Sequence, residues 1–510
     1  MCSGCGHELV MKDSIDKYKE LYTQILNCDE ETWLQVKQLD IVERIRQISE
    51  EKLFFHWQLE FPEIFFEFDN FGKQREGFDV IIGNPPWASV RGKHSAHMFN
   101  DSEILYLETK FPENTYMPNS YEFFILQALK LLNKGGRHSY IVPDRLAFNE
   151  SLKYLRNIML NQYSLNSLMF NPPFPNIIAD TLIYSLTAKN QVNNYKITVM
   201  NYDDKPVLIN SNYFQSSKET IFSFFRSEDI FKAIKAIEGA NTIKLDQIAE
   251  TTSGFGGKSN LITSTRVNDQ QIEVIKGLNI GRYSLEGKLY FEFKKENITG
   301  RTTNLKKLGA APKVLLRKTG KVLYSMYNDT GIYPEQSLYF LFNFKGRYSP
   351  FYILSLINSS LFKFFYIEKL VTNRDTTPQL KKIHLDQFPI KKIEFDTNEQ
   401  IITSSYYKII EFYELFLDNG DLALFESFID EQFEDGMNNS TSKKNDVLHD
   451  VLSYLAQKMM EYNVCKLDDK SYERKFCLTD KLIDSLVFKL FDLNSVNVNT
   501  INKALIERGI

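Results

Sequence analysis

The stretch that decides the fold is FDVIIGNPPW, residues 78–87. Its first five residues are nearly all apolar, which predicts a strand buried on both faces and bounded by Gly83. Asn84-Pro85-Pro86-Trp87 cannot continue a sheet ladder, because neither proline has an N–H to donate. Each proline also holds the residue before it in an extended conformation. The sequence therefore predicts a stiff loop at the carboxyl end of a strand, presenting one amide side chain, two carbonyls and one large aromatic face.

The composition of the 510-residue chain is that of an ordinary globular protein, with 43% hydrophobic and 25% charged residues. No apolar run approaches the roughly 20 residues of a membrane span, and the first residues lack the pattern of a signal peptide. Five cysteines are too few for a disulfide framework in a chain of this length. These features predict a cytoplasmic protein without a membrane partner. With a net charge of −4, any surface for nucleic acid must be a local patch.

Cys2, Cys5 and His7 have half the spacing of a zinc ribbon. A structural zinc site needs four ligands, and no second cysteine pair follows at ribbon spacing. We therefore expect a metal-free terminus and no metal site in the chain.

Helices and strands alternate after residue 77, which predicts an α/β sheet. The residues before it have helical periodicity, those from about 240 to 395 form short β-like segments, and those after 395 are helical again, with a polar linker at 434–446. The expected strands of the α/β sheet are 78–82, 138–142, 165–170 and 181–187, and its expected helices are 119–133, which ends at Lys134-Gly135-Gly136, and 149–162.

An Asn-Pro-Pro-aromatic loop after a hydrophobic strand resembles the catalytic loop of amino-group DNA methyltransferases. These enzymes methylate N6 of adenine or, less often, N4 of cytosine. The resemblance implies that the Asn84 side chain and the Pro85 carbonyl accept the two N–H groups of the target amine, and that the flipped base stacks on Trp87. Pro86 completes the rigid loop. The alternative is a plain strand-ending turn, and a second triplet, Asn171-Pro172-Pro173, shows that such turns recur.

The residues around the loop are similar to adenine methyltransferases of the Taq type, the gamma class. The segment 119–148 has that family's order of helix, Gly-Gly turn, strand and Val-Pro, and 174–186 resembles a later motif. The resemblance implies a target-base pocket near Asn119, Tyr121 and Phe174, with Phe174 opposite the loop aromatic. The segment 55–65, FHWQLEFPEIF, resembles type IIG restriction–modification enzymes, and we interpret Trp57, Phe61 and Pro62 within it as core packing.

The family binds S-adenosylmethionine at a glycine loop after its first strand, with an acidic residue after the second. No strand, Gly-x-Gly and helix stand in this order before residue 78. The expected fold is therefore the C-terminal half of a Rossmann-like methyltransferase sheet, in which Asn84 alone would approach the methyl end of the cofactor. Either a second polypeptide carries the cofactor-binding half, or the chain is an inactive truncated remnant. The sequence leaves both open.

Residues 240–395 resemble the mixed α+β target-recognition domain that follows the catalytic domain in this family. Residues 301–325 contain seven basic residues and no acidic one, which is typical of a phosphate-contacting surface, although a solvated charged face has the same composition. We interpret the segment 253–258, SGFGGK, as a flexible loop near DNA. The expected contacts with double-stranded DNA are Lys258, Lys313, Arg317, Lys318, Lys321 and Arg374.

The leading hypothesis is an adenine-N6 DNA methyltransferase component of a restriction–modification or phage-defence system. The alternatives are a non-catalytic DNA-specificity subunit, a cytosine-N4 methyltransferase, and a nuclease suggested by the Glu473-x-Lys475 spacing. The expected regions are a helical lead-in (1–77), a partial catalytic domain (78–190), a connecting region (191–239), the target-recognition domain (240–395) and a helical C-terminal region (396–510).

Overall fold

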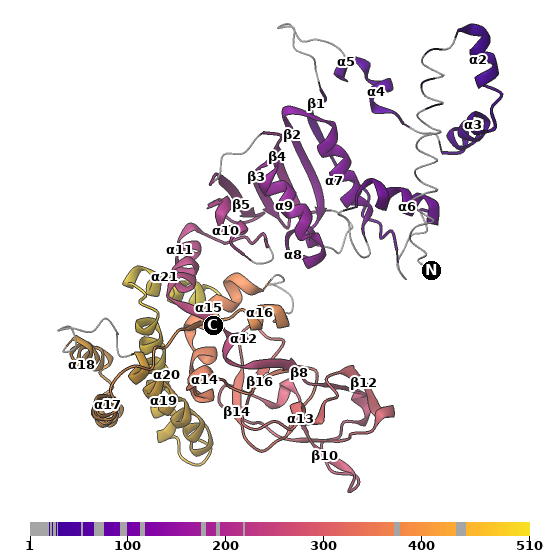
Figure 1. Ribbon diagram of the computed structural model, residues 1–510. Helices are drawn as coiled ribbons and strands as arrows, with labels where there is room; N and C mark the ends of the chain where they lie inside the picture. Colours follow the sequence, from indigo (N-terminus) through magenta and orange to yellow (C-terminus); the bar gives the residue numbers. More distant parts are fainter. Residues whose placement is uncertain are drawn as a thin grey trace. The chain divides into compact units, whose positions relative to one another are not determined.

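A computed structural model describes residues 29–52, 55–65, 76–91, 99–112, 118–174, 180–189, 194–217, 220–371, 378–434 and 445–510, with Glu20, Thr23 and Asn27 (Figure 1). The chain divides into two units. The first comprises Met1–Ile81 with Leu126–His138, and the second comprises Ile82–Ile125 with Ser139–Ile510. Cys2, Cys5, His7, Arg374 and most of the predicted 434–446 linker lie outside the described residues, so the structure does not test the predictions for them.

Short helices precede the first strand, as the sequence predicts. Within the first unit, the rings of Trp57, Phe61 and Phe65 pack around Phe78, with centroids 5.5–5.6 Å away. The aromatic rings are in contact, but the prediction of core packing is wrong for Trp57, which is 37% exposed, and for Pro62, which is also exposed. The helices are α2 (Glu30–Val36), α3 (Asp40–Lys52), α4 (Trp57–Glu60) and α5 (Pro62–Phe65).

The predicted α/β sheet is present and has six strands in the order β1-β2-β4-β3-β5-β6. Strand β3 pairs antiparallel with β4 and parallel with β5, and α9 (Lys153–Asn161) lies against β3 (Figure 1). The strands are β1 (Phe78–Gly83), β2 (Leu132–Pro143), β3 (Ser164–Phe170), β4 (Thr181–Thr187), β5 (Lys196–Asn201) and β6 (Val207–Asn210).

Strand β1 lies at one edge of this sheet. Its apolar sequence predicts burial on both faces, but Val80 is 59% and Ile82 77% exposed. The prediction of burial is wrong for the described chain, because the face of β1 that carries Val80 and Ile82 is exposed. The outer edge of β1 is also without a described partner strand.

The Gly-Gly segment does not end the preceding helix. Helix α7 (Ser120–Leu131) leads directly into β2, so Gly135 and Gly136 lie within the strand. A Cβ atom on Gly136 would lie 2.7 Å from the carbonyl oxygen of Phe78. The glycine is therefore needed for close backbone approach rather than for a helix cap.

Two predicted loops contain regular structure. The proposed connecting region contributes β5 and β6 to the sheet, followed by α10 (Ser211–Gln215) and α11 (Glu228–Gly239). The segment 88–118 includes α6 (Asp101–Lys110), whose start is fixed by a capping box between Asn100 and Glu103.

The segment after α11 is rich in short strands, as predicted, around a buried apolar core. The main sheet of this region has the order β14-β13-β16-β8. The SGFGGK segment is not a flexible loop: strand β9 within it is buried and pairs with β12. The strands are β7 (Thr242–Lys244), β8 (Glu250–Ser253), β9 (Phe255–Gly257), β10 (Gln271–Ile275), β11 (Leu289–Glu292), β12 (Ile298–Arg301), β13 (Lys313–Arg317), β14 (Ser325–Asn328), β15 (Tyr333–Pro334), β16 (Leu338–Phe342) and β17 (Pro389–Lys391).

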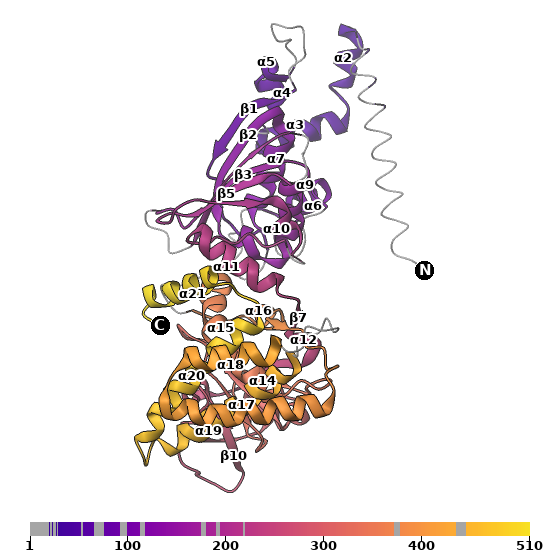
Figure 2. The same ribbon diagram turned by 90° about the vertical axis from the view of Figure 1, so that its left-hand side faces the viewer.

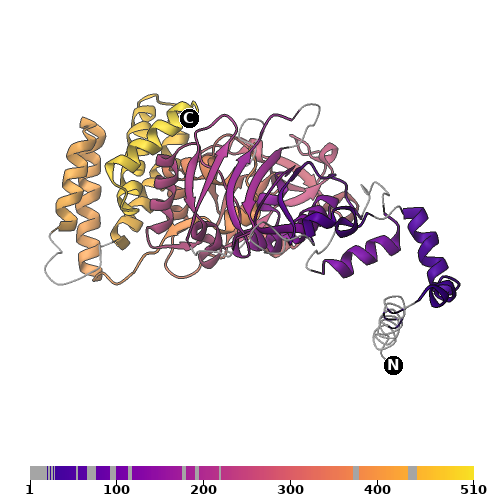
Figure 3. The same cartoon turned by 90° about the horizontal axis from the view of Figure 1, so that it is seen from above.

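The C-terminal region is helical, as predicted. Helices α19 and α20 pack side by side, and α14 contacts α19 (Figure 2). Helices α17 and α18 form a second pair (Figure 3), and α17 ends at Gly420, whose φ of 72° favours glycine. The helices are α14 (Pro350–Asn358), α15 (Ser360–Phe365), α17 (Glu399–Asn419), α18 (Leu422–Glu434), α19 (Asn445–Cys465), α20 (Ser471–Leu490) and α21 (Ser495–Glu507).

No single described helix is long and apolar enough to cross a membrane. The pair Pro350–Asn358 and Ser360–Leu370, bent by 60°, meets the criteria of length and composition when its two helices are taken together.

Candidate active site

The loop Asn84-Pro85-Pro86-Trp87 follows β1 directly. Asn84 and Pro86 are exposed, Pro85 is buried and Trp87 is partly buried. Neither the Asn84 side chain nor the Pro85 carbonyl makes a hydrogen bond with any described residue. Two oxygen acceptors predicted from the sequence are thus unengaged within the described chain.

Ser120, at the start of α7, fixes the loop. Its hydroxyl donates to the Pro86 carbonyl at 2.5 Å and accepts from the Ala88 N–H at 3.1 Å. The Ser120 N–H in turn donates to the Ala88 carbonyl at 2.9 Å. Ser120 is 1% exposed, so these bonds are shielded from competing water. The sequence did not predict a role for Ser120. A serine directly after the predicted pocket residue Asn119 is too common a pattern to indicate one.

The aromatic residues of the two Asn-Pro-Pro triplets meet. The rings of Trp87 and Phe174 have centroids 5.4 Å apart and planes inclined at 39°. A base sandwiched between parallel rings needs about 7 Å between them, twice the contact distance of about 3.5 Å between carbon atoms. The two rings are therefore neighbours, and they must separate before a base can lie between them.

The two triplets differ in their asparagines. Asn171 has a φ of 53°, and its amide donates to the Asn201 side chain at 2.9 Å. Asn171 therefore has a structural role, whereas Asn84 is exposed and uncommitted. The geometry separates a turn from a candidate reactive loop where the sequence pattern alone does not.

The other two predicted pocket residues lie close to the loop but differ in accessibility. Asn119 is partly exposed and forms a β-bridge with Ser89, and its N–H donates to Glu122 at 2.9 Å. Tyr121 is only 2% exposed, and burial, reinforced by the charge of Glu122, raises the pKa of its hydroxyl. The Tyr121 ring is thus part of the core and presents almost no surface to a base.

A pair of carboxylates lies where β2 ends and β4 begins. The Asp144 N–H donates to the Asp180 carbonyl at 3.0 Å. Burial, and then the charge of Asp180, raise the pKa of Asp144 to about 7, while Lys381 acts in the opposite direction. The sequence analysis did not identify this pair, because residues 144 and 180 are distant in the chain.

Several of the predicted DNA-contacting residues are committed inside the fold. Lys313 is fully buried and donates to the carbonyls of Leu308 and Ile332 at 2.5 and 2.7 Å, and burial lowers its pKa to about 8. Arg317 donates to two backbone carbonyls, those of Gly277 and Ile280. Lys313 therefore has no surface for a phosphate, and the structure assigns it to the core.

Among the remaining basic residues, Lys318 is buried and the others are accessible. Lys258 and Lys321 are exposed, as is Arg301 nearby in sequence. Lys318 is 7% exposed and donates to the Ser253 hydroxyl at 2.5 Å, and burial followed by the charge of Arg301 lowers its pKa to about 8. Lys258, Lys321 and Arg301, the first residue of the predicted basic segment 301–325, can thus contact a phosphate with no change in fold.

The described residues do not fit S-adenosylmethionine as a complete site. Helices α2 to α5 account for the regular structure described before β1, with no strand and glycine loop among them. The described chain also contains no group of three or more side chains suited to a metal ion. Glu473 and Lys475 lie on helix α20, so the nuclease spacing has no strand to support it.

Family models match two parts of the chain. Residues 9–173 match the Eco57I restriction-modification methylase model, and residues 272–390 match the TaqI-like C-terminal specificity domain.

Curated relatives share low identity with the chain. A putative type II restriction enzyme and methyltransferase of Methanocaldococcus jannaschii is 23% identical over 66% of this chain and 28% of its own length. A type II methyltransferase of Thermus thermophilus is 28% identical over 20% of this chain and 24% of its own length. The type II restriction enzyme and methyltransferase RM.Eco57I of Escherichia coli is 23% identical over 45% of this chain and 22% of its own length. The chain thus spans about a quarter of the length of the curated relatives it matches.

Solved structures are more distant. The type IIL restriction-modification enzyme MmeI in complex with DNA has a TM-score of 0.44 and 9% identity, covering 84% of this chain and 57% of its own. The type IIG restriction endonuclease BpuSI has a TM-score of 0.29 and 11% identity, and the match covers 80% of this chain and 54% of the BpuSI chain. The family matches show that residues 9–173 belong to the Eco57I-type restriction-modification methylases and residues 272–390 to the TaqI-like C-terminal specificity domains.

Proposed function

We propose that this chain provides the base-binding loop and the DNA-recognition region of a site-specific adenine-N6 DNA methyltransferase in a restriction–modification or related defence system. The observation that carries the proposal is the Asn84–Trp87 loop, held by Ser120, with two uncommitted acceptors and with Trp87 facing Phe174. The matches to the methylase model, over residues 9–173, and to the specificity-domain model, over residues 272–390, support it.

The chemistry explains the residues. An adenine amine is a weak nucleophile because its lone pair is delocalised into the ring. If Asn84 Oδ1 and the Pro85 carbonyl each accept one N–H of the amine, its nitrogen rehybridises and its lone pair becomes directed. The prolines and Ser120 hold these acceptors before the base arrives, so little reorganisation is needed.

S-adenosylmethionine is the methyl donor that the family implies, and we infer that a second polypeptide carries its binding site. The support is the outer edge of β1, where exposed Val80 and Ile82 lie on a strand with an unpaired edge in the described sheet. Such an edge pairs readily with another strand. The proposed location is the cytoplasm, where the DNA substrate lies.

The test is transfer of a labelled methyl group from S-adenosylmethionine to double-stranded DNA, with and without a candidate partner. Nucleoside analysis of the product distinguishes N6-methyladenine from N4-methylcytosine. We expect label in N6-methyladenine when the partner is present. Specific DNA binding without label in either form would instead identify a non-catalytic specificity subunit, and absence of both would identify an inactive remnant.

Replacement of Ser120 by alanine is expected to lower methyl transfer by the completed enzyme about tenfold. The loop would lose two hydrogen bonds, each worth about 1 kcal/mol, and its acceptors would need to reorganise. The measurement is single-turnover methylation at saturating DNA. Ser89→Ala is the matched control, because the exposed Ser89 hydroxyl bonds only locally to the Arg91 carbonyl. Equal rates in the two variants would refute the positioning role.

Trp87→Ala is expected to weaken capture of the target base more than Trp87→Phe, because base–aromatic stacking is worth about 1–3 kcal/mol. Phenylalanine keeps a π-face toward Phe174, whereas alanine removes it. The measurement is the fluorescence of 2-aminopurine at the target position. The stacking role fails if both complexes give the same fluorescence.

A further inference from the structure

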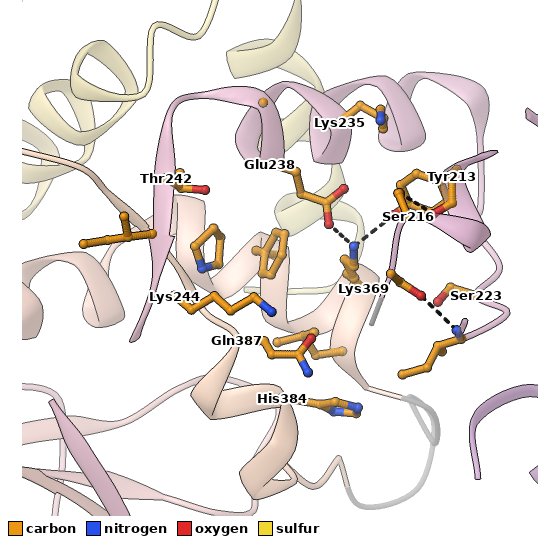
Figure 4. Close-up of a pocket in the computed structure, with 17 residues that line it drawn as sticks. Tyr213, Ser216, Ser223, Lys235, Glu238, Thr242, Lys244, Lys369, His384 and Gln387 are labelled. Carbon is orange, nitrogen blue, oxygen red and sulfur yellow. Dashed lines mark hydrogen bonds and ion pairs between the residues drawn. The ribbon is translucent and has the colours of Figure 1, made fainter. Parts of the chain in front are cut away.

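A cavity of about 470 Å³ lies away from the Asn84 loop, where residues 213–244 meet residues 365–389 (Figure 4). Its walls come from α10, α11 and β7 on one side. On the other side they come from α15, the π-helix η5 (Tyr366–Leu370), α16 (Lys382–Asp386) and β17. The second wall lies within the specificity-domain match, and the first lies in neither matched segment.

The cavity has a surplus of positive charge. Lys235, Lys244 and Lys369 line it, against the single carboxylate of Glu238. Lys369 forms an ion pair with Glu238 and donates to the Tyr213 hydroxyl at 2.9 Å. Lys235 and Lys244 form no ion pair with any described residue, so two positive charges remain uncompensated.

The cavity also offers uncommitted hydrogen-bonding groups. The side chains of Ser223, Thr242 and Gln387 line it and make no hydrogen bond with a described residue. Nδ1 of His384 is buried without a described partner, and burial lowers the pKa of this side chain to about 4. A neutral imidazole with an unpaired nitrogen favours a ligand that brings a donor.

Apolar side chains complete the lining. Phe365, Leu370, Ile243 and Pro389 supply this surface next to the charged groups. Pockets of about 300–1,000 Å³ accommodate small molecules, and the mostly polar lining of this one suits a charged ligand.

We propose that this cavity binds a phosphate-bearing ligand of nucleotide size, with the phosphate attracted by Lys235 and Lys244 and a ligand donor facing His384. The same phosphate chemistry has two sources, a free nucleotide and the backbone of bound DNA. The volume of about 470 Å³ and the rings of Tyr213 and Phe365 in the lining fit a small ligand with a base, and we therefore commit to the free nucleotide. A bound ligand would contact both the specificity domain, through residues 365–389, and the segment 213–244 that precedes this domain. The proposal does not rest on methyl transfer.

The test uses the full chain and three probes: adenosine monophosphate, inorganic phosphate and a DNA duplex. The variant is Lys235→Gln/Lys244→Gln. The control, Lys189→Gln/Lys232→Gln, removes the same charge at exposed positions outside the cavity lining. All four lysines are exposed, so both variants are expected to fold. The readouts are calorimetric binding and the unfolding temperature, at constant ionic strength.

We expect saturable binding of adenosine monophosphate that raises the unfolding temperature by about 2–4 °C at saturation. The cavity variant should weaken this binding at least about tenfold, and the control by less than about twofold. If neither small probe binds but the cavity variant alone loses about tenfold in duplex affinity, the DNA backbone supplies the phosphate. The proposal is overturned if the cavity variant and the control behave alike with every probe.

Discussion

Replacement of Asn84 by alanine is expected to lower methyl transfer by the completed enzyme by about 10²–10³-fold while leaving DNA affinity largely unchanged. Asn84 provides the only side-chain acceptor of the loop, and loss of one transition-state acceptor has an effect of this size. Its side chain bonds to no described residue, so its removal should not disturb the fold. The measurement is the single-turnover rate with labelled S-adenosylmethionine, alongside duplex binding.

Asn166→Ala is the matched control, because it removes the same side chain from the exposed face of β3, where the amide donates to the Thr187 hydroxyl at 2.8 Å. Its rate should stay close to that of the unmodified chain. Activity of Asn84→Ala within about tenfold of wild type would exclude Asn84 as the amine acceptor. A matching loss of DNA affinity would show that Asn84 acts in binding rather than in chemistry.

The sequence predicts the α/β sheet well because its strands are short, apolar and separated by turn residues. The predicted strand 78–82 corresponds to β1, 165–170 to β3 and 181–187 to β4. Local patterns failed where a distant backbone decided the outcome. Gly135 and Gly136 resemble a helix end, yet they lie in β2, where the close approach of the Phe78 carbonyl requires a glycine at position 136.

The candidate site was predictable only in part, for the same physical reason. The residue pattern identified the Asn84–Trp87 loop, and the resemblance paired Trp87 with Phe174, which the structure brings into contact. The residue pattern did not identify Ser120, because a hydroxyl that bonds to a loop more than 30 residues away leaves no local pattern. The same pattern placed Lys313 among the surface charges. A lysine whose ammonium group bonds to buried carbonyls cannot be distinguished in the sequence from an exposed lysine.

The isolated 510-residue chain is expected to show no saturable binding of S-adenosylmethionine at concentrations up to about 1 mM, a level at which the free energy of binding is only about −4 kcal/mol. In this fold, affinity for the cofactor comes from backbone N–H groups of a glycine loop after a strand, and from an acidic residue that binds the ribose. The described residues before β1 form helices without such a loop. Asn84 would contact only the methyl end of the cofactor.

Calorimetry on the chain alone, and then on the chain with a candidate partner, measures this difference. We expect binding to strengthen at least about a hundredfold when the partner is present, since a strand added to the open edge of β1 would bring the missing loop to the Asn84 side of the sheet. Duplex binding by the chain alone should persist and weaken steeply with salt, because Lys258, Arg301 and Lys321 are exposed, and the last two lie within the specificity-domain match. Saturable micromolar binding of the cofactor by the isolated chain would contradict the proposal that a second polypeptide carries the cofactor-binding site. The 510 residues would then hold a cofactor site outside their described part, and the open edge of β1 would need another explanation.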